Sequence, residues 1–373
     1  MSHVHQFYSW AKRQGLVAGS PIPLRVRRPP PNGTVVAAGD AMVPATIAHD
    51  ERGERIEWLP PASYRLWRDV GVRGYGADGL PRADFRGRWS ARNAVFTDLM
   101  VRTGMRLQEQ SSLLVCEVAR GSGAGGYRRF WLPAAIAKGG SARWSYVPRI
   151  VEADLNAYRE EDRAEVVAHA QARRRYDTIR RPLVVPDPQQ PFIAVRASSP
   201  GRSEIDVGHL RPAERHRLLR DSGEGLEPAM LWLGESGMPL RLPTWKSMFG
   251  TANERCRREG VAVACHAHML RHTFAVVTLE QLQRGHIAAL GELNPDQRGH
   301  YTRIFGDPLD WVRRRLGHAS VLSTVIYLHA LQELEMVTRM ALVGDQWQEL
   351  DDPRVGPFDE AASEDGIAGK AGR

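Results

Sequence analysis

The sequence predicts a mixed fold that is mainly α-helical and contains a small antiparallel β-sheet. Helical spacing of apolar residues occurs in six segments, at residues 90–104, 151–181, 244–259, 268–284, 308–316 and 331–342. Short β-type runs occupy three segments, at residues 112–118, 128–133 and 143–147. The turn Lys138-Gly139-Gly140 lies between the last two runs, an arrangement that is typical of a β-hairpin.

Local signals define the first elements in chain order. Residues 4–11 carry apolar side chains at i, i+3, i+4 and i+7, which predicts a short N-terminal helix. The Pro-rich segment 21–33 cannot be helical and predicts an extended linker. Ser90 is a suitable N-cap for the next helix, which we expect to end at Gly104.

Composition indicates a soluble globular protein. The chain has 373 residues, enough for two domains or one large domain with appendages, and 42% of them are apolar. No run of about 18 apolar residues exists, so no membrane span is expected. The three cysteines, Cys116, Cys256 and Cys265, lack metal-ligand spacing. We expect reduced thiols and a cytoplasmic location.

The charge of the chain favours a nucleic-acid partner. The formal net charge is +8, and excess positive charge attracts polyanions. Of the 51 basic residues only four are lysines: Lys12, Lys138, Lys246 and Lys370. This bias is typical of a GC-rich genome, in which Arg occupies positions that need only a positive charge. A retained Lys therefore indicates a position where Arg does not serve.

Three motifs bring together residue types that suit phosphate chemistry. Residues 268–275 read HMLRHTFA, so a histidine and an arginine lie three apart and share one helix face. Residues 316–320 read LGHAS, and a tyrosine follows that histidine by nine residues. Farther upstream, residues 103–109 read TGMRLQE.

The order and spacing of these residues resemble the catalytic domain of the tyrosine recombinase (phage integrase) family. That family carries an H-x-L-R-H-T-F-A helix, then L-G-H-x-S, then a tyrosine nine residues after that histidine. It also has an earlier arginine in T-G-x-R-x-x-E and a lysine in a hairpin turn. By this resemblance, the candidate catalytic residues are Arg106, Lys138, His268, Arg271, His318 and Tyr327. The resemblance covers about residues 85–345. It implies the family's catalytic-domain fold, with insertions, and site-specific DNA cleavage and rejoining.

Phosphodiester chemistry explains the roles that the resemblance implies. The forked, always-charged guanidiniums of Arg106 and Arg271 would neutralise the non-bridging phosphate oxygens. Tyr327 would attack the phosphorus and form a 3′-phosphotyrosyl intermediate. Lys138 would protonate the departing 5′-oxygen, which Arg cannot usefully do because its pKa is higher. The two motif histidines would hydrogen-bond the phosphate, and one of them would help to deprotonate the tyrosine. No metal or other cofactor is expected.

Neighbouring polar residues have alternative interpretations. By resemblance, Glu109 is a buried partner that organises Arg106. His266, His268 and His272 invite a zinc site, but the carboxylate that a zinc hydrolase requires is missing. We interpret His272 as structural, holding its helix against its neighbours.

The resemblance also predicts how the chain is organised. Residues 1–19 would be the last helix of an N-terminal core-binding domain, and 20–84 a Pro- and Gly-rich linker and irregular segment. The catalytic domain would span 85–347, and 348–373 would be a disordered acidic tail. With so little before the linker, the chain is interpreted as a truncated reading frame or a natural fragment.

Two long spacings between motifs predict insertions, at about 155–230 and 280–308. These would be extra DNA-binding or assembly surfaces, or tolerated loops. The basic run Arg173, Arg174 and Arg175 lies in the first of them. It is expected to be a solvated helix face or a contact to DNA phosphates.

The implied partner is double-stranded DNA, bound by a homotetramer on two paired recombination sites, with accessory proteins as further partners. Two other functions stay open. A truncated relative could bind DNA, or cap another recombinase, without cleaving efficiently. A type IB-like topoisomerase shares these motifs and would relax supercoils without paired sites.

Overall fold

The computed structural model describes residues 10–12, 14–17, 24–26, 42–44, 56–119, 126–197, 204–292, 307–319, 323–328 and 330–331. The chain divides into two units, Met1–Arg55 and Ile56–Arg373. In the first unit, residues 10–12 are helical, and β1 (Leu24–Val26) pairs antiparallel with β2 (Met42–Pro44). Most of the predicted N-terminal helix, the helix expected beyond residue 331 and the acidic tail lie outside the described residues.

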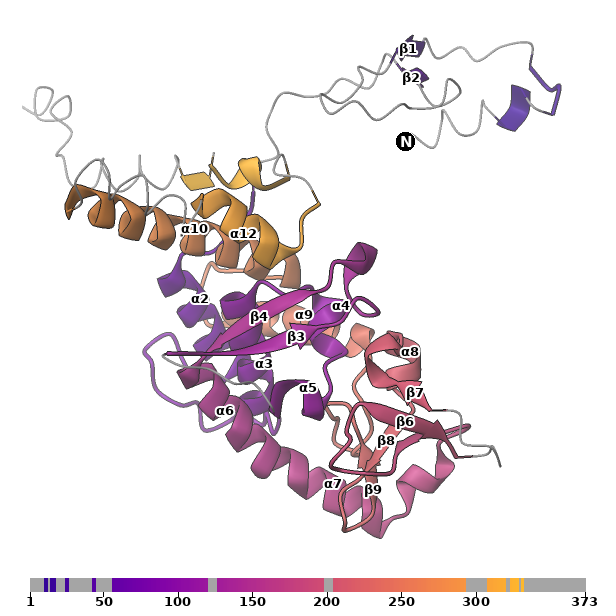
Figure 1. Ribbon diagram of the computed structural model, residues 1–373. Coiled ribbons are helices and arrows are strands. Elements are labelled where there is room, and N and C mark those ends of the chain that lie inside the picture. The colour runs from indigo at the N-terminus through magenta and orange to yellow at the C-terminus, as the bar shows by residue number, and fades with distance from the viewer. Residues whose placement is uncertain are drawn as a thin grey trace, which may run out of the picture. The chain divides into compact units, whose positions relative to one another are not determined.

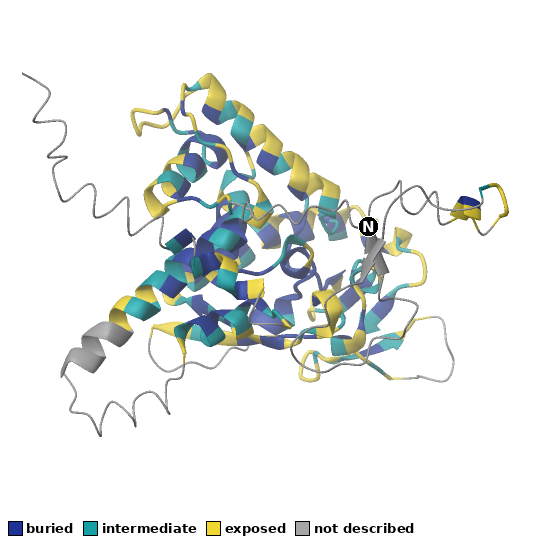
Figure 2. Ribbon diagram, turned by 90° about the horizontal axis from the view of Figure 1, so that it is seen from above, coloured by how far each residue is buried: buried dark blue, intermediate teal, exposed yellow. Residues whose placement is uncertain are grey.

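The second unit is mainly helical and is built around α3 (Ser90–Thr103), whose residues from Ala94 to Met100 are all buried. This helix packs against α10 (Ala267–Glu292), α6 (Arg149–Glu160) and the hairpin of β3 (Tyr127–Leu132) and β4 (Arg143–Pro148), as Figure 1 shows. Buried residues are concentrated in the interior of the second unit, and exposed ones lie along its outer surface (Figure 2). Within the described residues, no helix is both long and apolar enough to cross a membrane.

Two segments differ from the sequence-based expectation near α3. The sequence predicts an irregular segment up to residue 84, yet α2 (Pro61–Trp67) and the π-helical turn η1 (Arg68–Val72) form there, with Trp67 fully buried. The N-cap of α3 is Trp89 rather than Ser90, and no side chain caps it. The C-terminal end is as predicted, with Gly104 in the left-handed conformation at φ 64°. A Cβ there would lie 2.3 Å from the Phe274 ring, so glycine also permits α10 to approach.

The predicted hairpin is confirmed. Strands β3 (Tyr127–Leu132) and β4 (Arg143–Pro148) pair antiparallel with Trp131 opposite Trp144, and the 3-10 turn η2 (Lys138–Gly140) lies between them. Side chains alternate between a buried and an exposed face, as expected for a strand with one face on the core.

The strand predicted at 112–118 is wrong, because residues Val115–Ala119 form the short helix α5. The backbone N–H of Leu114 donates to the Glu117 carboxylate at 2.9 Å, which favours a helical turn at this point. That carboxylate also pairs with the fully buried Arg215, at 2.8 Å. Arg215 is 98 residues away in sequence, so local propensity does not reveal this contact.

The segment predicted as the first insertion forms a structural layer of its own. It contains α7 (Asp162–Ala172), the 3-10 turns η3 (Arg175–Thr178) and η4 (Val207–His209), and α8 (Pro212–Arg215). A five-stranded sheet has the order β7-β6-β5-β8-β9. Its strands are β5 (Leu183–Val185), β6 (Ile193–Arg196), β7 (Ile205–Asp206), β8 (Leu218–Asp221) and β9 (Leu226–Pro228). The β5–β8 pair is parallel and the other pairs are antiparallel.

The helical segment predicted at 151–181 is confirmed only in part, because it forms two helices, α6 and α7, with a break at Glu161, and α7 ends at Ala172. The helices predicted at 244–259, 268–284 and 308–316 are confirmed with small changes of boundary. The helix expected at 244–259 is α9 (Leu242–Arg258), and the one expected at 268–284 is α10, which continues to Glu292. The helix expected at 308–316 is α12 (Pro308–Leu316), capped by the Asp307 side chain, which accepts from the Leu309 N–H. Residues 323–328 are also helical. The observed fold is therefore mixed and mainly helical, with small β-sheets that are chiefly antiparallel.

Candidate active site

Arg271 joins α10 to the C-terminal ends of two other helices. It is 2% exposed, and its guanidinium donates hydrogen bonds to the carbonyl oxygens of Gly104, at 2.6 Å, and Leu316, at 2.5 Å. Carbonyls at a helix C-terminus lack partners within the helix and carry partial negative charge. Arg271 therefore satisfies the ends of both α3 and α12 and links both helices to α10.

Glu109 connects two further arginines. This residue of α4 (Leu107–Ser111) is 1% exposed and lies 3.0 Å from the Arg106 guanidinium, as the resemblance implies. It also pairs with the buried Arg143 at 2.6 Å. Burial alone would raise the pKa of Glu109, but the hydrogen bonds and charges of Arg143 and Arg106 outweigh it and lower that pKa. The carboxylate is therefore ionised and holds both arginines in place.

Lys138 lies at the exposed tip of the β3–β4 hairpin. At the turn end of strand β4, the Arg143 Nε donates to the Arg315 carbonyl at 2.8 Å. Gly317, in the left-handed conformation at φ 64°, ends α12 beside this point. A Cβ on Gly317 would lie 2.8 Å from the Ser141 hydroxyl. The glycine of the LGHAS motif thus allows the hairpin that carries Lys138 to pack against the end of α12.

Tyr327 lies beside two histidines. Its hydroxyl is 3.0 Å from the His272 Nδ1, and its ring stacks on that of His318 at a centroid distance of 6.3 Å. The His318 Nδ1 in turn hydrogen-bonds the Thr324 hydroxyl at 3.0 Å. Tyr327 is 1% exposed. Burial raises the pKa of Tyr327, although the charges of Arg271 and Arg106 act in the opposite direction.

Positive charge dominates the cluster formed by the candidate catalytic residues. Burial, followed by the charge of Arg106, lowers the pKa of Arg271 to about 9. Burial and neighbouring cations also lower the pKa of His268, and the cations include Arg271, Arg106 and Lys138. These residues are therefore close enough to one another to interact electrostatically. An anion such as a phosphate, placed among them, would relieve this repulsion.

The structure accordingly brings the six predicted catalytic residues into one region. His268 is exposed, and its ring lies 4.3 Å from that of His272. Among the described residues, no group of three or more His, Cys, Asp or Glu side chains could hold a metal ion. His266 of the zinc alternative lies 3.4 Å from Glu57.

The basic run at 173–175 is separate from this cluster. All three arginines are exposed, at the end of α7 and in η3, and Arg174 pairs with Asp177 at 2.9 Å. In Figure 1, α7 lies at the opposite end of the second unit from α10 and α12. A role for these arginines in DNA binding stays a prediction.

Sequence reasoning missed three participants. The sequence suggests a structural role for His272, yet this histidine is hydrogen-bonded to the candidate nucleophile. His272 follows His268 by four residues and so shares its helix face, and this spacing could have indicated that His272 lies near the site. Arg143 and Thr324 belong to no motif. Arg143 could have been suspected only from the alternation of β4, which turns it to the buried face.

The histidines predict a specific pH dependence of stability. His272 and His318 have pKa values lowered to about 4, by burial first and by neighbouring cations second, from an ordinary value of 6.5. Between these values the unfolded chain binds more protons than the folded one, so stability falls as the pH is lowered from about 6.5 to about 4. Urea midpoints measured across this range should show the loss. Combined His272→Gln and His318→Gln replacements should flatten it, whereas an unchanged pH profile would contradict this assignment.

No protein-family model matches the chain, and no curated protein matches it. Among solved structures, the chain is similar to the XerH site-specific recombinase bound to palindromic difH substrate in a post-cleavage complex. The identity is 15% over 78% of this chain and 54% of that chain, with a TM-score of 0.39. For the XerA recombinase the identity is 14%, over 76% of this chain and 65% of that chain, with a TM-score of 0.39.

The Tn1549 transposon integrase in complex with a circular intermediate DNA is also similar. The identity is 12%, over 72% of this chain and 60% of that chain, with a TM-score of 0.37. The chain thus spans less than two thirds of the length of each of these three proteins. The chain is therefore similar, at low identity and low TM-score, to two recombinases and a transposon integrase.

Proposed function

We propose that this chain cleaves and rejoins double-stranded DNA at specific sites through a covalent 3′-phosphotyrosyl intermediate on Tyr327. The observation that carries the proposal is the position of the Tyr327 hydroxyl. It lies 3.0 Å from the His272 Nδ1 and within electrostatic reach of Arg271 and Arg106. A nucleophile, a neutral base and two guanidiniums suited to a phosphate thus occur together.

The step balances without a metal or redox partner. The Tyr327 oxygen bonds to phosphorus while its proton passes to the His272 Nδ1, which is neutral at pH 7 because its pKa is about 4. The bond from phosphorus to the 5′-oxygen breaks, and Lys138 donates a proton to the departing oxygen. Negative charge on the non-bridging oxygens is stabilised by the two arginines and the two motif histidines, which are Arg106, Arg271, His268 and His318. Attack by the 5′-hydroxyl of another strand reverses these events and releases the tyrosine.

The burial of Tyr327 adds a condition to this mechanism. At 1% exposure its hydroxyl is sheltered, so a phosphate reaches it only after neighbouring side chains move. Anion binding among the arginines would also raise the pKa of the histidines and make His272 a better proton acceptor. In this proposal, DNA binding makes the Tyr327 hydroxyl accessible, and the DNA phosphate supplies negative charge among the arginines. Assembly as a homotetramer on two paired sites, with accessory proteins, belongs to the same proposal.

Covalent trapping on DNA of randomised sequence tests the proposal for any target site. The full chain is incubated with a library of nicked duplexes, and DNA that remains attached to denatured protein is recovered and sequenced. We expect adducts enriched in one sequence, attached to Tyr327, and none with Tyr327→Phe because phenylalanine lacks the attacking oxygen. The matched variant Tyr75→Phe, in a half-buried tyrosine outside the candidate site, should retain them.

Other outcomes separate the alternatives. Sequence-specific binding without any adduct would favour a recombinase relative that binds DNA without cleaving it. Adducts without sequence preference, accompanied by relaxation of supercoils, would favour a topoisomerase. Adducts that persist in Tyr327→Phe would refute the assigned nucleophile.

A further inference from the structure

The exposed face of the β3–β4 hairpin carries large aromatic side chains. Strand alternation directs Trp131 and Trp144 away from the core, and they remain 46% and 40% exposed. They lie opposite each other across the two strands. A tryptophan that is left in water on a sheet face stabilises the fold less than a buried one. Two such residues side by side therefore indicate a binding surface.

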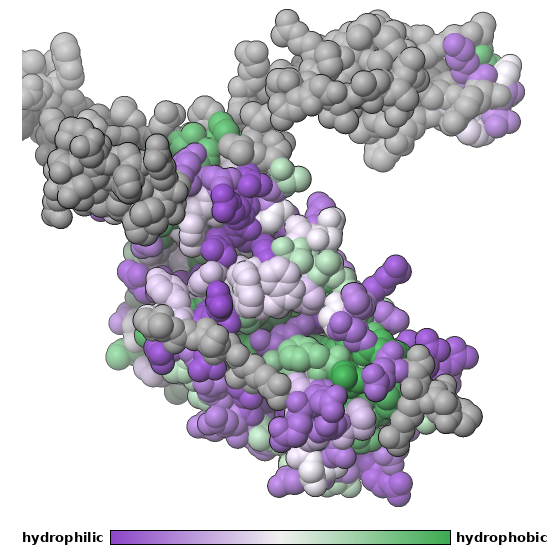
Figure 3. Space-filling model, in the orientation of Figure 1, coloured by the Kyte–Doolittle hydropathy of each residue, from purple (hydrophilic) through white to green (hydrophobic). Residues whose placement is uncertain are grey.

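Arginines stack on these rings. The Trp131 and Trp144 rings lie 5.2 Å apart, and the Arg129 guanidinium lies 4.7 Å from the centre of the Trp144 ring. Alongside, the Arg315 guanidinium lies between the Tyr146 ring, at 4.1 Å, and the Trp311 ring, at 4.8 Å. The six residues of these two stacks form what we call the aromatic–arginine face: Arg129, Trp131, Trp144, Tyr146, Trp311 and Arg315. Figure 3 shows pale aromatic side chains bordered by hydrophilic ones over the hairpin.

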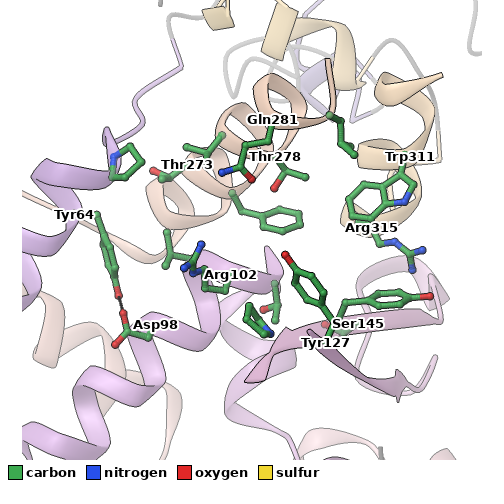
Figure 4. Close-up of a pocket in the computed structure, with 18 of the residues that line it drawn as sticks. Tyr64, Asp98, Arg102, Tyr127, Ser145, Thr273, Thr278, Gln281, Trp311 and Arg315 are labelled. Carbon is green, nitrogen blue, oxygen red and sulfur yellow. Dashed lines mark hydrogen bonds between the residues drawn. The ribbon is translucent and has the colours of Figure 1, made fainter. Parts of the chain in front are cut away.

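A cavity of about 460 Å³ adjoins this face and shares Trp144, Tyr146, Trp311 and Arg315 with it. Figure 4 shows Tyr127 and Ser145 of the hairpin on one side of the cavity, and Thr278 and Gln281 of α10 on the other. The Ser145 hydroxyl is buried and has no hydrogen-bond partner in the part of the chain that the structure describes. The cavity therefore combines aromatic walls with polar side chains such as Thr278 and Gln281.

The charge around the cavity is positive. Arg65, Arg102 and Arg315 line it, and none of them forms an ion pair within the described residues. The one carboxylate in its wall, that of Asp98, is engaged by the Tyr64 hydroxyl at 2.8 Å and by Arg68 at 3.0 Å. The surface consequently suits a flat aromatic ligand that carries negative charge.

We propose that the aromatic–arginine face binds single-stranded DNA, with unpaired bases stacking on its rings and phosphates held by its arginines. Rings and guanidiniums that track a chain are the usual means of binding unpaired nucleotides. A duplex has its bases already stacked and does not offer their faces. A protein partner would also use tryptophans, but the positive charge of the arginines around the cavity favours a polyanion.

The binding itself does not depend on the proposed strand cleavage, but its purpose rests on that function. The same hairpin carries Lys138 at its tip and Arg143 on its buried face. Nucleotides that lose their pairing near a cleaved phosphate would therefore meet the aromatic–arginine face. Equilibrium binding needs no covalent chemistry, so absence of an adduct would leave this proposal standing.

Fluorescence anisotropy with a labelled oligothymidylate, compared with a labelled duplex at the same salt concentration, tests the proposal on the full chain. Trp131→Leu and Trp144→Leu should each weaken single-strand binding about tenfold, because leucine keeps apolar bulk but has no π face. Duplex binding should change by less than about twofold. Trp144→Phe should restore most of the single-strand affinity, and the matched variant Leu80→Ala, at a residue 64% exposed, should not alter it.

Three results would overturn the proposal. Equal losses on single strands and duplex would indicate a general basic surface. Unchanged binding in both leucine variants would show that the rings do not stack on bases. Self-association of the parent chain that Trp131→Leu abolishes in sedimentation, with single-strand affinity unaltered, would assign the face to a second copy of the chain.

Discussion

Arg271→Ala is expected to destabilise the fold by about 2–6 kcal/mol, since each unsatisfied buried carbonyl costs about 1–3 kcal/mol. The Arg271 guanidinium hydrogen-bonds the carbonyl oxygens of Gly104 and Leu316, at the ends of two helices. Loss of its charge should also lower the yield of covalent complex at least about 10²-fold. Urea unfolding and covalent trapping measure the two effects separately.

Two comparisons make this prediction specific. Arg271→Lys keeps one positive charge, but lysine lacks the fork that reaches two carbonyls, so its stability should lie between those of the parent and Arg271→Ala. The matched control is Arg314→Ala, in an α12 arginine whose side chain is 72% exposed and pairs with Asp310. That surface pair should contribute no more than about 1 kcal/mol. Equal effects of Arg271→Ala and Arg314→Ala would contradict the proposed link between helices.

Glu109→Gln is expected to destabilise the protein by about 3–5 kcal/mol, the usual cost of breaking a buried ion pair. Glutamine has nearly the same shape, so the change isolates the charge that compensates Arg106 and the buried Arg143. Adduct formation should fall as well, because both arginines lose the group that orients them. The midpoint of urea unfolding at neutral pH measures the stability loss.

The pH dependence gives a second readout for Glu109. Its pKa in the folded protein is lowered from an ordinary 4.5. It therefore contributes stability above about pH 4.5 that is lost as the pH falls through the folded value. Glu109→Gln should lack this acid-dependent loss. Glu254→Gln, which removes an exposed partner of Arg257, should change stability by no more than about 1 kcal/mol. A similar small change for Glu109→Gln would refute the buried network.

Features that depend on a few neighbouring residues could be predicted from the sequence. The β3–β4 hairpin required only two strand patterns and the Gly-rich turn at Lys138. The ends of α3 and α12 required only Gly104 and Gly317, which adopt the left-handed conformation that other residues avoid. The six candidate catalytic residues were likewise found from motifs, because their spacing is local within each motif.

Contacts between distant segments could not be predicted, because their free energy depends on the folded arrangement. The segment 112–118 has strand-like composition, yet the ion pair of Glu117 with Arg215 accompanies a helix there. The parallel pairing of β5 with β8 joins strands that are separated by two others along the chain. No local sequence pattern distinguishes Arg143 from the other arginines, because its role depends on its ion pair with Glu109 in the folded chain.

The sequence by itself singled out the candidate catalytic residues, because a possible nucleophile, cations and histidines are recognisable from residue type and local spacing. The tertiary structure alone decided how they are held. It joined Arg271 to the ends of two helices, placed His272 rather than His268 against the Tyr327 hydroxyl, and left an aromatic face on the hairpin exposed. The physical reason is that burial and hydrogen-bond partners are properties of the packed chain, whereas residue type and short spacing belong to the sequence.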